Sequence, residues 1–425
     1  MMFHLLLISL GVYFIGCGTG NNGGDPNRFM NGGAQKARQP GISMDGKPIP
    51  GYNPVDIPLI SPSGRVCSGT GISMYTWGYE VWNNTDSPVI NFLQNPKVAA
   101  NYGCGDVYIN VADYSAPRYI RDEYALVPFI RNVRATGNRG IVFLVYGDVQ
   151  VSSNGAPNGP TEFADTFFDW LWRIEDADLQ AMVPLGVSYD CEHLSHLTIE
   201  NALNRAQQLK ADFVKKRLGG DASLLTIEWT IEGQEKPHDT DIVMKLSDRA
   251  LMMAYRNHVA TSERDPRGED NIITRVMDFM FTKQCTHCLD DSYAAKHYKA
   301  KIKIMMEADC LCGQSCHKIS FCAYDAKADV WGRNNHSGVK SYSNGAQYMM
   351  GTITEAEKRL RDRLGPSKYQ RLFGTTDNLS LFVIHNWNWF TCYFDDPSLY
   401  ITTPIGTKRE TCSSYHIYAN SCRSQ

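Results

Sequence analysis

Two acidic residues, Asp190 and Glu192, stand at the end of an apolar run in the stretch LGVSYDCEHLS, residues 185–195. If this run is a strand, its side chains alternate, so both carboxylates point to one side and Cys191 to the other. Two carboxylates in a low-dielectric site do not both ionise easily, so the pKa of one rises and that group can act as a general acid. The pattern therefore predicts acid–base chemistry at the end of this strand.

Polar and aromatic residues also end several other apolar runs. Carboxylates, a tyrosine, an arginine and tryptophans that converge on one mouth are typical of a carbohydrate site, because sugar C–H faces stack on indole rings and sugar hydroxyls bind carboxylates and amides. Glycosidic cleavage also needs a carboxylic acid beside the leaving oxygen. The strand-end candidates for this site, besides the acidic pair, are Trp77, Glu228, Tyr255, Arg256, Glu307, Asn386 and Trp387.

Eight short apolar runs provide the elements that would position these residues. They cover residues 71–77, 106–114, 140–148, 181–190, 224–230, 250–255, 301–309 and 379–387. Near-continuous apolar runs of this length predict strands that are buried on both faces, as in a parallel sheet. The last residue of each run would then lie at the carboxyl edge of the sheet.

Segments with helical periodicity lie between most of these runs. They include residues 123–136, 162–177 and 198–218, the last with Thr198 as its predicted N-cap. This alternation predicts a (β/α)8 TIM barrel, whose active site is built at the carboxyl ends of the strands. A doubly wound sheet is the alternative, but the sequence lacks the glycine-rich phosphate loop that usually follows its first strand.

The acidic stretch resembles the D-G-x-D-x-D-x-E signature of glycoside hydrolase family 18, which includes chitinases and endo-β-N-acetylglucosaminidases. In LGVSYDCE the residues Gly186, Asp190 and Glu192 match that signature. MAYR, residues 253–256, is similar to the M-x-Y-D of the family's sixth strand, with Met253 and Tyr255 matching. HNWNW, residues 385–389, is similar to the tryptophan-bearing eighth strand.

The resemblance implies a retaining, substrate-assisted hydrolysis of β-linked N-acetylglucosamine glycans, either chitin or the N-glycan core. Glu192 would be the general acid, and Asp190 would support the 2-acetamido group whose carbonyl attacks the anomeric carbon. Tyr255 would hydrogen-bond the acetamido oxygen, and Trp387 would stack beneath the sugar. Met253 would line the same site.

This chain departs from the family pattern at four positions. Leu185 and Ser188 stand where the signature has aspartates, Cys191 replaces an aromatic residue, and Arg256 replaces the aspartate after the family tyrosine. Two alternatives therefore stay open. One is a catalytically inactive, lectin-like barrel, and the other is a retaining glycosidase with Glu192 as acid and Glu307 as nucleophile.

The ends of the chain differ in composition from the barrel region. Residues 1–17 carry an apolar stretch that predicts a secretory signal peptide, with a buried helix as the alternative. FIGC also resembles a bacterial lipoprotein processing site, which would make Cys17 a lipid anchor. Residues 18–65 predict a Gly/Pro/Asn-rich leader, either flexible or laid over the domain as a strap, residues 66–395 the barrel, and residues 396–425 a cysteine-containing tail.

Cysteine content and charge indicate the compartment and partners. Without Cys17, 12 of the 13 cysteines remain, an even number that favours disulfides in insertions of a secreted chain over a zinc site. We expect no cofactor and no metal, an oligosaccharide as partner, and a monomer. The net charge is −3 and the sequence has no basic block, so we expect no nucleic acid partner. The sequence also has no second apolar run long enough to span a membrane. The dense cysteines are Cys285, Cys288, Cys310, Cys312, Cys316 and Cys322, and the glycosylation sequons begin at Asn83, Asn335 and Asn378.

Overall fold

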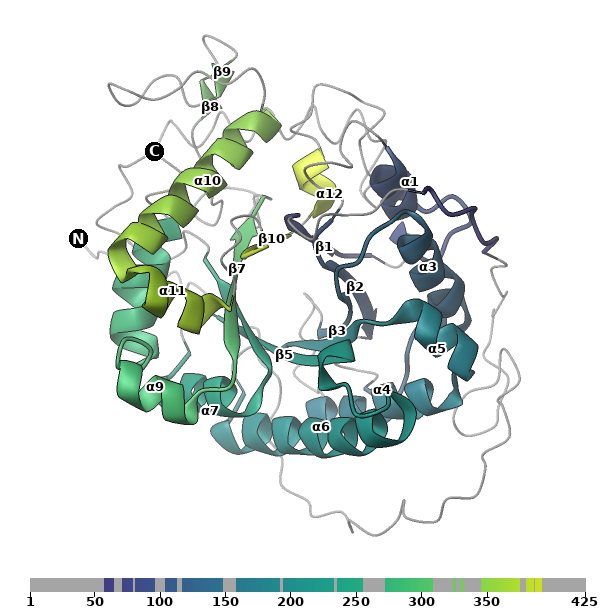
Figure 1. Cartoon of the computed structure of the whole chain (residues 1–425), viewed down its shortest axis with the longest axis horizontal. Helices are drawn as coiled ribbons and strands as arrows, with labels where there is room; N and C mark the ends of the chain where they lie inside the picture. Colours follow the sequence, from purple (N-terminus) through teal and green to yellow (C-terminus); the bar gives the residue numbers. More distant parts are fainter. Residues whose placement is uncertain are drawn as a thin grey trace, which may run out of the picture.

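The protein folds as a closed barrel of eight parallel strands with helices around its outside (Figure 1). This arrangement confirms the predicted (β/α)8 TIM barrel. The structure is a computed structural model, and it describes residues 57–64, 71–78, 81–95, 104–112, 117–147, 158–191, 194–232, 235–254, 272–308, 324–325, 330–331, 345–374, 380–385 and 387–391.

Six of the eight barrel strands lie within the predicted apolar runs; the fifth, Leu225–Ile231, ends one residue after its run, and the sixth, Arg249–Met253, begins one residue before its run. Neighbours along the chain are neighbours in the sheet, and the last strand pairs with the first to close the barrel. The strands are β1 (Ser73–Thr76), β2 (Val107–Ala112), β3 (Val142–Gly147), β4 (Leu185–Asp190), β5 (Leu225–Ile231), β6 (Arg249–Met253), β7 (Lys301–Glu307) and β10 (Phe382–His385).

Helices connect the strands and cover the outside of the barrel (Figure 1). They are α1 (Pro88–Gln94), α3 (Glu123–Ala135), α4 (Gly159–Arg173), α5 (Asp176–Met182), α6 (His196–Arg217), η2 (Ala222–Leu224), α7 (Pro237–Leu246), η3 (Thr274–Gln284), α9 (Asp291–His297), α10 (Gly345–Leu364), α11 (Pro366–Phe373) and α12 (Trp387–Phe390). A separate antiparallel pair, β8 (Tyr324–Asp325) and β9 (Val330–Trp331), lies outside the barrel.

Two details of the helix prediction are wrong. The predicted helix over residues 162–177 is two helices, because Ile174 and Glu175 adopt extended backbone angles between α4 and α5. The N-cap of α6 is Ser195 and not Thr198, because Ser195 is extended and its hydroxyl accepts a hydrogen bond from the Thr198 amide. Thr198 therefore lies inside the first turn of the helix.

Alternating strand side chains build two apolar layers. One side of each strand packs against the helices and forms the large outer core, which includes Val187 and Tyr189 of β4. The other side points into the barrel, where a smaller aromatic and aliphatic cluster fills the interior. The interior cluster consists of Tyr75, Tyr108, Phe143, Val145, Leu251, Met253, Met305 and Val383.

Part of the predicted leader lies against the barrel as a strap. The Asn132 side chain of α3 donates to the Pro58 carbonyl at 2.9 Å and accepts from the Ile60 amide at 3.0 Å. The Ser63 amide donates to the Ala135 carbonyl at the end of α3. Residues 57–64 are thus held on the domain, whereas the predicted signal peptide, residues 1–17, and tail, residues 396–425, lie outside the described residues.

Three of the four cysteines that the structure describes are disulfide-bonded, whereas Cys191 is buried and lies outside any disulfide. Cys285 and Cys288 form a disulfide, so the CTHC pair does not supply two thiolates to zinc, and Cys104 is disulfide-bonded as well. Cys310, Cys312, Cys316 and Cys322 lie outside the described residues, as do Cys17 and the sequons at Asn335 and Asn378. Asn83 is described, and its side-chain amide donates to Asp122.

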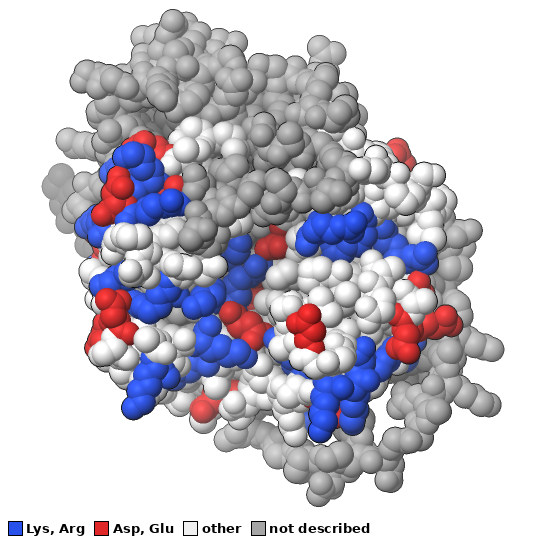
Figure 2. Space-filling view, in the orientation of Figure 1, with Lys and Arg blue, Asp and Glu red and all other residues white. Residues whose placement is uncertain are grey.

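Charge is mixed over the molecular surface shown in Figure 2, where basic and acidic side chains lie interspersed. Among the helices of the described ranges, none is both long and apolar enough to cross a bilayer.

Candidate active site

Asp190 ends β4 with its side chain at the mouth of the barrel. The residue is 6% exposed, and its Oδ2 accepts a hydrogen bond of 2.8 Å from the Tyr75 hydroxyl of β1. Gly186, Ser188 and Asp190 occupy alternate positions of β4 and so share its inner face. The predicted strand-end carboxylate is therefore placed in the mouth, and a tyrosine from the opposite side of the barrel fixes its orientation.

Glycines clear the space that this arrangement needs. Gly147 is in register with Asp190, and a Cβ atom there would lie 2.7 Å from the Asp190 carbonyl oxygen and 2.8 Å from its Cβ. A Cβ atom at Gly186 would lie 2.4 Å from the Phe143 ring, which fills the barrel interior beneath the mouth. Gly186, which matches the glycine of the family signature, thus leaves the space that the Phe143 ring occupies.

The surroundings of Asp190 change its acidity. Burial raises the pKa of Asp190, and two groups offset this rise only in part: the neighbouring His385, when its ring is protonated, and the Tyr75 hydroxyl. The carboxyl group therefore takes up a proton more readily than an exposed aspartate does. A carboxyl group of this kind can accept or supply a hydrogen bond to a polar substituent of a bound substrate.

A second polar cluster lies at the mouth on β7, β10 and the end of β1. His385, the last residue of β10, is in register with Glu307, and its Nδ1 lies 2.5 Å from the Glu307 Oε2. Its Nε2 accepts a hydrogen bond from the Trp77 indole N–H. Trp77 is half-buried, whereas the Glu307 side chain is fully buried. Trp77 and Glu307, two of the predicted site residues, are thus both hydrogen-bonded to His385.

Glu228 lies deeper in the barrel than the sequence indicates. It is fully buried in the middle of β5, where its carboxylate accepts hydrogen bonds from Ser188 at 2.8 Å, Tyr108 at 2.9 Å and Arg249 at 2.5 Å. Arg249 also bonds Asp106 at 2.9 Å. The expectation that Glu228 belongs to the sugar-binding mouth is corrected, because β5 continues for three residues beyond it.

Arg249 stays charged inside this deeper network. Burial alone would lower its pKa, but Tyr108 and the carboxylates of Asp106 and Glu228 raise the pKa above its usual range. The guanidinium also lies 4.4 Å from the centre of the Phe143 ring. The network thus forms a charged, hydrogen-bonded floor under the mouth.

Trp387 and Met253 lie near the mouth without an open face. Trp387 is fully buried in α12 and packs against Phe92 and Phe390, with ring centres 5.2 and 4.6 Å away. Met253 is 7% exposed and belongs to the interior cluster. The predicted stacking role of Trp387 stays a prediction, and its ring is covered in this structure.

Four predicted site residues lie outside the described residues: Glu192, Tyr255, Arg256 and Asn386. The separation of Asp190 from Glu192, and of Glu192 from Glu307, is therefore left as a prediction. No group of three or more His, Cys, Asp or Glu side chains in the described ranges is arranged to hold a metal ion.

Sequence reasoning missed Tyr75, Gly147 and His385. His385 directly precedes Asn386 at the end of the eighth apolar run, so the rule that selected strand-end residues also selects this histidine. Tyr75 stands two residues before Trp77 and therefore shares its face of the strand. Gly147 gave no such signal, because its importance depends on the register between β3 and β4.

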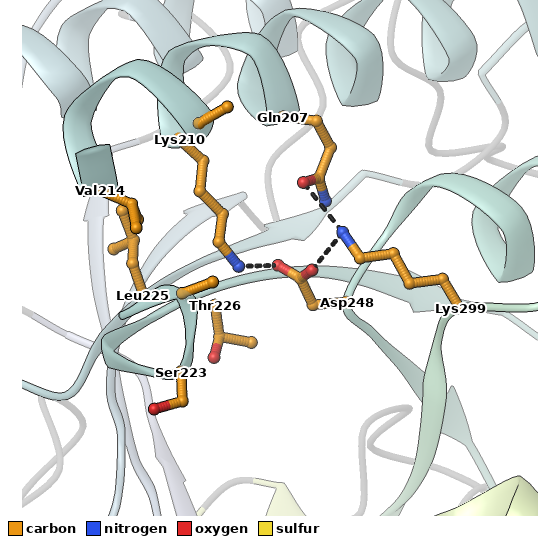
Figure 3. Close-up of a pocket in the computed structure, with 10 residues that line it drawn as sticks. Gln207, Lys210, Val214, Ser223, Leu225, Thr226, Asp248 and Lys299 are labelled. Carbon is orange, nitrogen blue, oxygen red and sulfur yellow. Dashed lines mark hydrogen bonds and ion pairs between the residues drawn. The ribbon is translucent and has the colours of Figure 1, made fainter. Parts of the chain in front are cut away.

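A second hollow lies at the amino ends of β5, β6 and β7, opposite the mouth (Figure 3). Lys210 from α6 and Lys299 both bind Asp248, at 2.8 and 2.5 Å, and Lys299 also donates to Gln207. Asp248 further accepts a hydrogen bond from the Ile227 amide at 2.8 Å. These contacts tie α6 to the strand ends and give the hollow a structural role.

The chain is similar to several solved structures, with TM-scores below 0.5. No protein-family model matches it, and no curated protein matches either. Among solved structures it is similar to a GH18 chitinase from Cycas revoluta in complex with allosamidin, with 13% identity, a TM-score of 0.41, and coverage of 81% of this chain and 99% of that one. A GH18 chitinase from Pseudoalteromonas aurantia gives 13% identity, a TM-score of 0.39, and coverage of 76% and 98%.

The spore cortex-lytic enzyme SleL from Bacillus cereus gives 11% identity and a TM-score of 0.33, with coverage of 58% of this chain and 52% of that one. The match thus spans about half the length of SleL.

Proposed function

We propose that this protein is a glycoside hydrolase that acts on β-linked N-acetylglucosamine glycans, such as chitin or the N-glycan core, by a retaining, substrate-assisted mechanism. We further propose that it acts as a secreted monomer. The observation that carries the catalytic proposal is Asp190, a buried carboxyl group at the carboxyl end of β4 that Tyr75 orients.

The proposed reaction assigns separate tasks to the substrate and the protein. Glu192 donates a proton to the glycosidic oxygen while the acetamido carbonyl oxygen attacks the anomeric carbon, so the bond to the leaving sugar breaks. Asp190 holds the acetamido group in position for this attack. Water then attacks the anomeric carbon and gives its proton to Glu192, while the bond between that carbon and the acetamido oxygen breaks; this restores the acid and the acetamido group and retains the configuration.

The experiment is hydrolysis of chitotetraose by the wild-type protein and by Glu192→Gln. We expect product from the wild type, and a loss of about 10²-fold or more with retained binding in the variant, because the amide cannot supply the proton. Glu175→Gln is the matched control, since Glu175 is exposed at the start of α5, away from the mouth.

Other outcomes would identify the alternatives. Chitotetraose bound without any product by the wild type would indicate a lectin-like barrel. Cleavage of cellotetraose, which lacks acetamido groups, together with inactivity of Glu307→Gln, would indicate the two-carboxylate mechanism. Absence of binding to either sugar would contradict the proposed substrate class.

A further inference from the structure

His385 joins the ends of three neighbouring strands at the barrel mouth. β10 pairs with β7 on one side and with β1 on the other. The imidazole bonds Glu307 of β7 through Nδ1 and accepts the indole N–H of Trp77, just after β1, through Nε2. The Trp77 and His385 rings meet edge to face, with centres 5.6 Å apart and planes at 81°.

The tryptophan fixes the protonation state of this histidine. An indole N–H can only donate a hydrogen bond, so Nε2 of His385 must present its lone pair. A neutral imidazole then carries its proton on Nδ1 and donates it to the Glu307 carboxylate. Protonation would place a second N–H at Nε2, directly opposite the Trp77 N–H, and the hydrogen bond between the two rings would be lost.

Trp77 has the position of a platform for a ligand. It is half-buried at the mouth, and its ring also contacts Tyr75, the residue that orients Asp190, at 5.3 Å. Trp387, by contrast, is fully buried. An amphipathic ring that is fixed at its N–H and partly open on its face suits stacking on the C–H face of a sugar.

We propose that neutral His385 is a positioning residue that holds Trp77 as the sugar-stacking ring, and that protonation of His385 releases this ring and weakens sugar binding. The inference rests on the proposed function only for the identity of the ligand. The positioning of Trp77 itself depends on the hydrogen bonds of His385.

The groups that face His385 affect its protonation in opposite directions. Glu307 on β7 and Asp190 on β4 favour the imidazolium, because both are carboxyl groups. The Trp77 N–H opposes it, and the Tyr75 ring, 5.1 Å from the imidazole, carries no charge. The test therefore spans about pH 5 to 8, the range in which histidine ordinarily changes charge.

The first test needs no ligand. The indole N–H NMR resonance of Trp77 is assigned by its loss in Trp77→Phe, and its shift is followed with pH. We expect a single titration in the wild type. In His385→Gln we expect a flat profile, because glutamine can accept from Trp77 and donate to Glu307 at every pH in this range. A wild-type resonance that does not titrate would overturn the inference.

The second test measures chitotetraose affinity at the same pH values. We expect binding by the wild type to weaken by about tenfold from pH 8 to pH 5, the effect of one lost hydrogen bond. His385→Gln should bind with little pH dependence, and His297→Gln, a change on an exposed residue of α9, should behave as the wild type.

The two tests separate the inference from the proposed function. A titrating Trp77 resonance without sugar binding at any pH would contradict the function and uphold the Trp77–His385 coupling. Sugar binding that is equally pH-dependent in the wild type and in His385→Gln would overturn the inference and leave the function standing.

Discussion

Asp190 combines a position at the barrel mouth with an unfavourable environment for its charge. Burial raises its pKa, so the folded state binds a proton more tightly than the unfolded state does. The stabilisation from this protonation is complete below the unfolded pKa of about 4 and is lost as pH rises through the folded pKa. At neutral pH the ionised carboxylate therefore costs stability.

Asp190→Asn is accordingly expected to raise the free energy of unfolding at pH 7 and to lower turnover. Thermal unfolding at pH 7 should show a gain on the order of 1 kcal/mol, and the gain should shrink in acid, where the wild-type group is protonated. Chitotetraose turnover should fall by about 10²-fold or more. A variant that is less stable than the wild type at pH 7 would contradict this account of Asp190.

At the residue scale, sequence reasoning succeeded where a side chain's place follows from strand alternation. Asp190, Glu307 and Trp77 were identified because each stands at the end of an apolar run. Glu228 was misplaced, because the sequence does not show that β5 continues to Ile231. His385 was overlooked because its role depends on Glu307 and Trp77, which lie far from it in the sequence.

At the scale of elements, β3 and β4 lie so close at Gly147 and Asp190 that there is no space for a side chain at Gly147. Gly147→Ala would bring a Cβ atom within 2.8 Å of the backbone oxygen and Cβ of Asp190. We expect destabilisation of about 1–3 kcal/mol and a loss of turnover of about tenfold or more, because a strand shift displaces Asp190. Urea unfolding and initial rates check the two effects.

Gly219→Ala is the control for that change. Gly219 has a φ of +62° and open space around it, so alanine there costs about 1–2 kcal/mol of backbone strain. It follows α6 at the amino-terminal side of the barrel, so activity should be retained. Equal losses of activity in both variants would mean that stability alone limits turnover.

Asp248 provides a second prediction at this scale, at the hollow shown in Figure 3. Burial raises its pKa, but Lys210, Lys299 and the Ile227 amide together bring the pKa below its ordinary value. This stabilisation is present above the unfolded pKa of about 4 and is lost as pH falls through the folded pKa. Asp248→Asn should therefore destabilise the protein at pH 7 by about 1–3 kcal/mol.

The unfolding free energies of wild type and Asp248→Asn should converge as the pH falls through the folded pKa of Asp248, which lies below its ordinary value, since both proteins then carry a neutral side chain. Lys216→Gln offers a matched control, because its ion pair with Asp212 on α6 is exposed. A difference at the Asp248 site that persists unchanged in acid would contradict the ion-pair explanation.

Element positions were predictable because buried parallel strands have a strong sequence signal. Each of the eight apolar runs overlaps a barrel strand, to within one residue at the end of β5 and the start of β6. Helix ends were harder to predict, since the break between α4 and α5 occurs at Ile174 and Glu175, two residues without a glycine or proline. Ser195 rather than Thr198 caps α6, and both residues are good caps, so only the backbone angles decide between them.

At the scale of the whole molecule, the pairing of β1 with β10, which closes the barrel, includes the fewest residues of any strand pairing in the barrel. It pairs two residues, Ser73 with Val383 and Met74 with Ile384, whereas β3 and β4 pair over six. We expect backbone amides of β1 and β10 to exchange with solvent faster than those of β3 and β4 in native-state hydrogen exchange. Uniform protection around the barrel would contradict this expectation.

This closure also determines when the site can first exist. Trp77 and His385 are separated by 308 residues, because they come from the first and last strands of the barrel. At ordinary rates of translation, Trp77 leaves the ribosome about 15 to 60 seconds before its partner is synthesised. A growing chain therefore carries Tyr75 and Trp77 without their β10 neighbour His385 for most of its synthesis. The contact between Trp77 and His385 can therefore form only after the last strand has been synthesised.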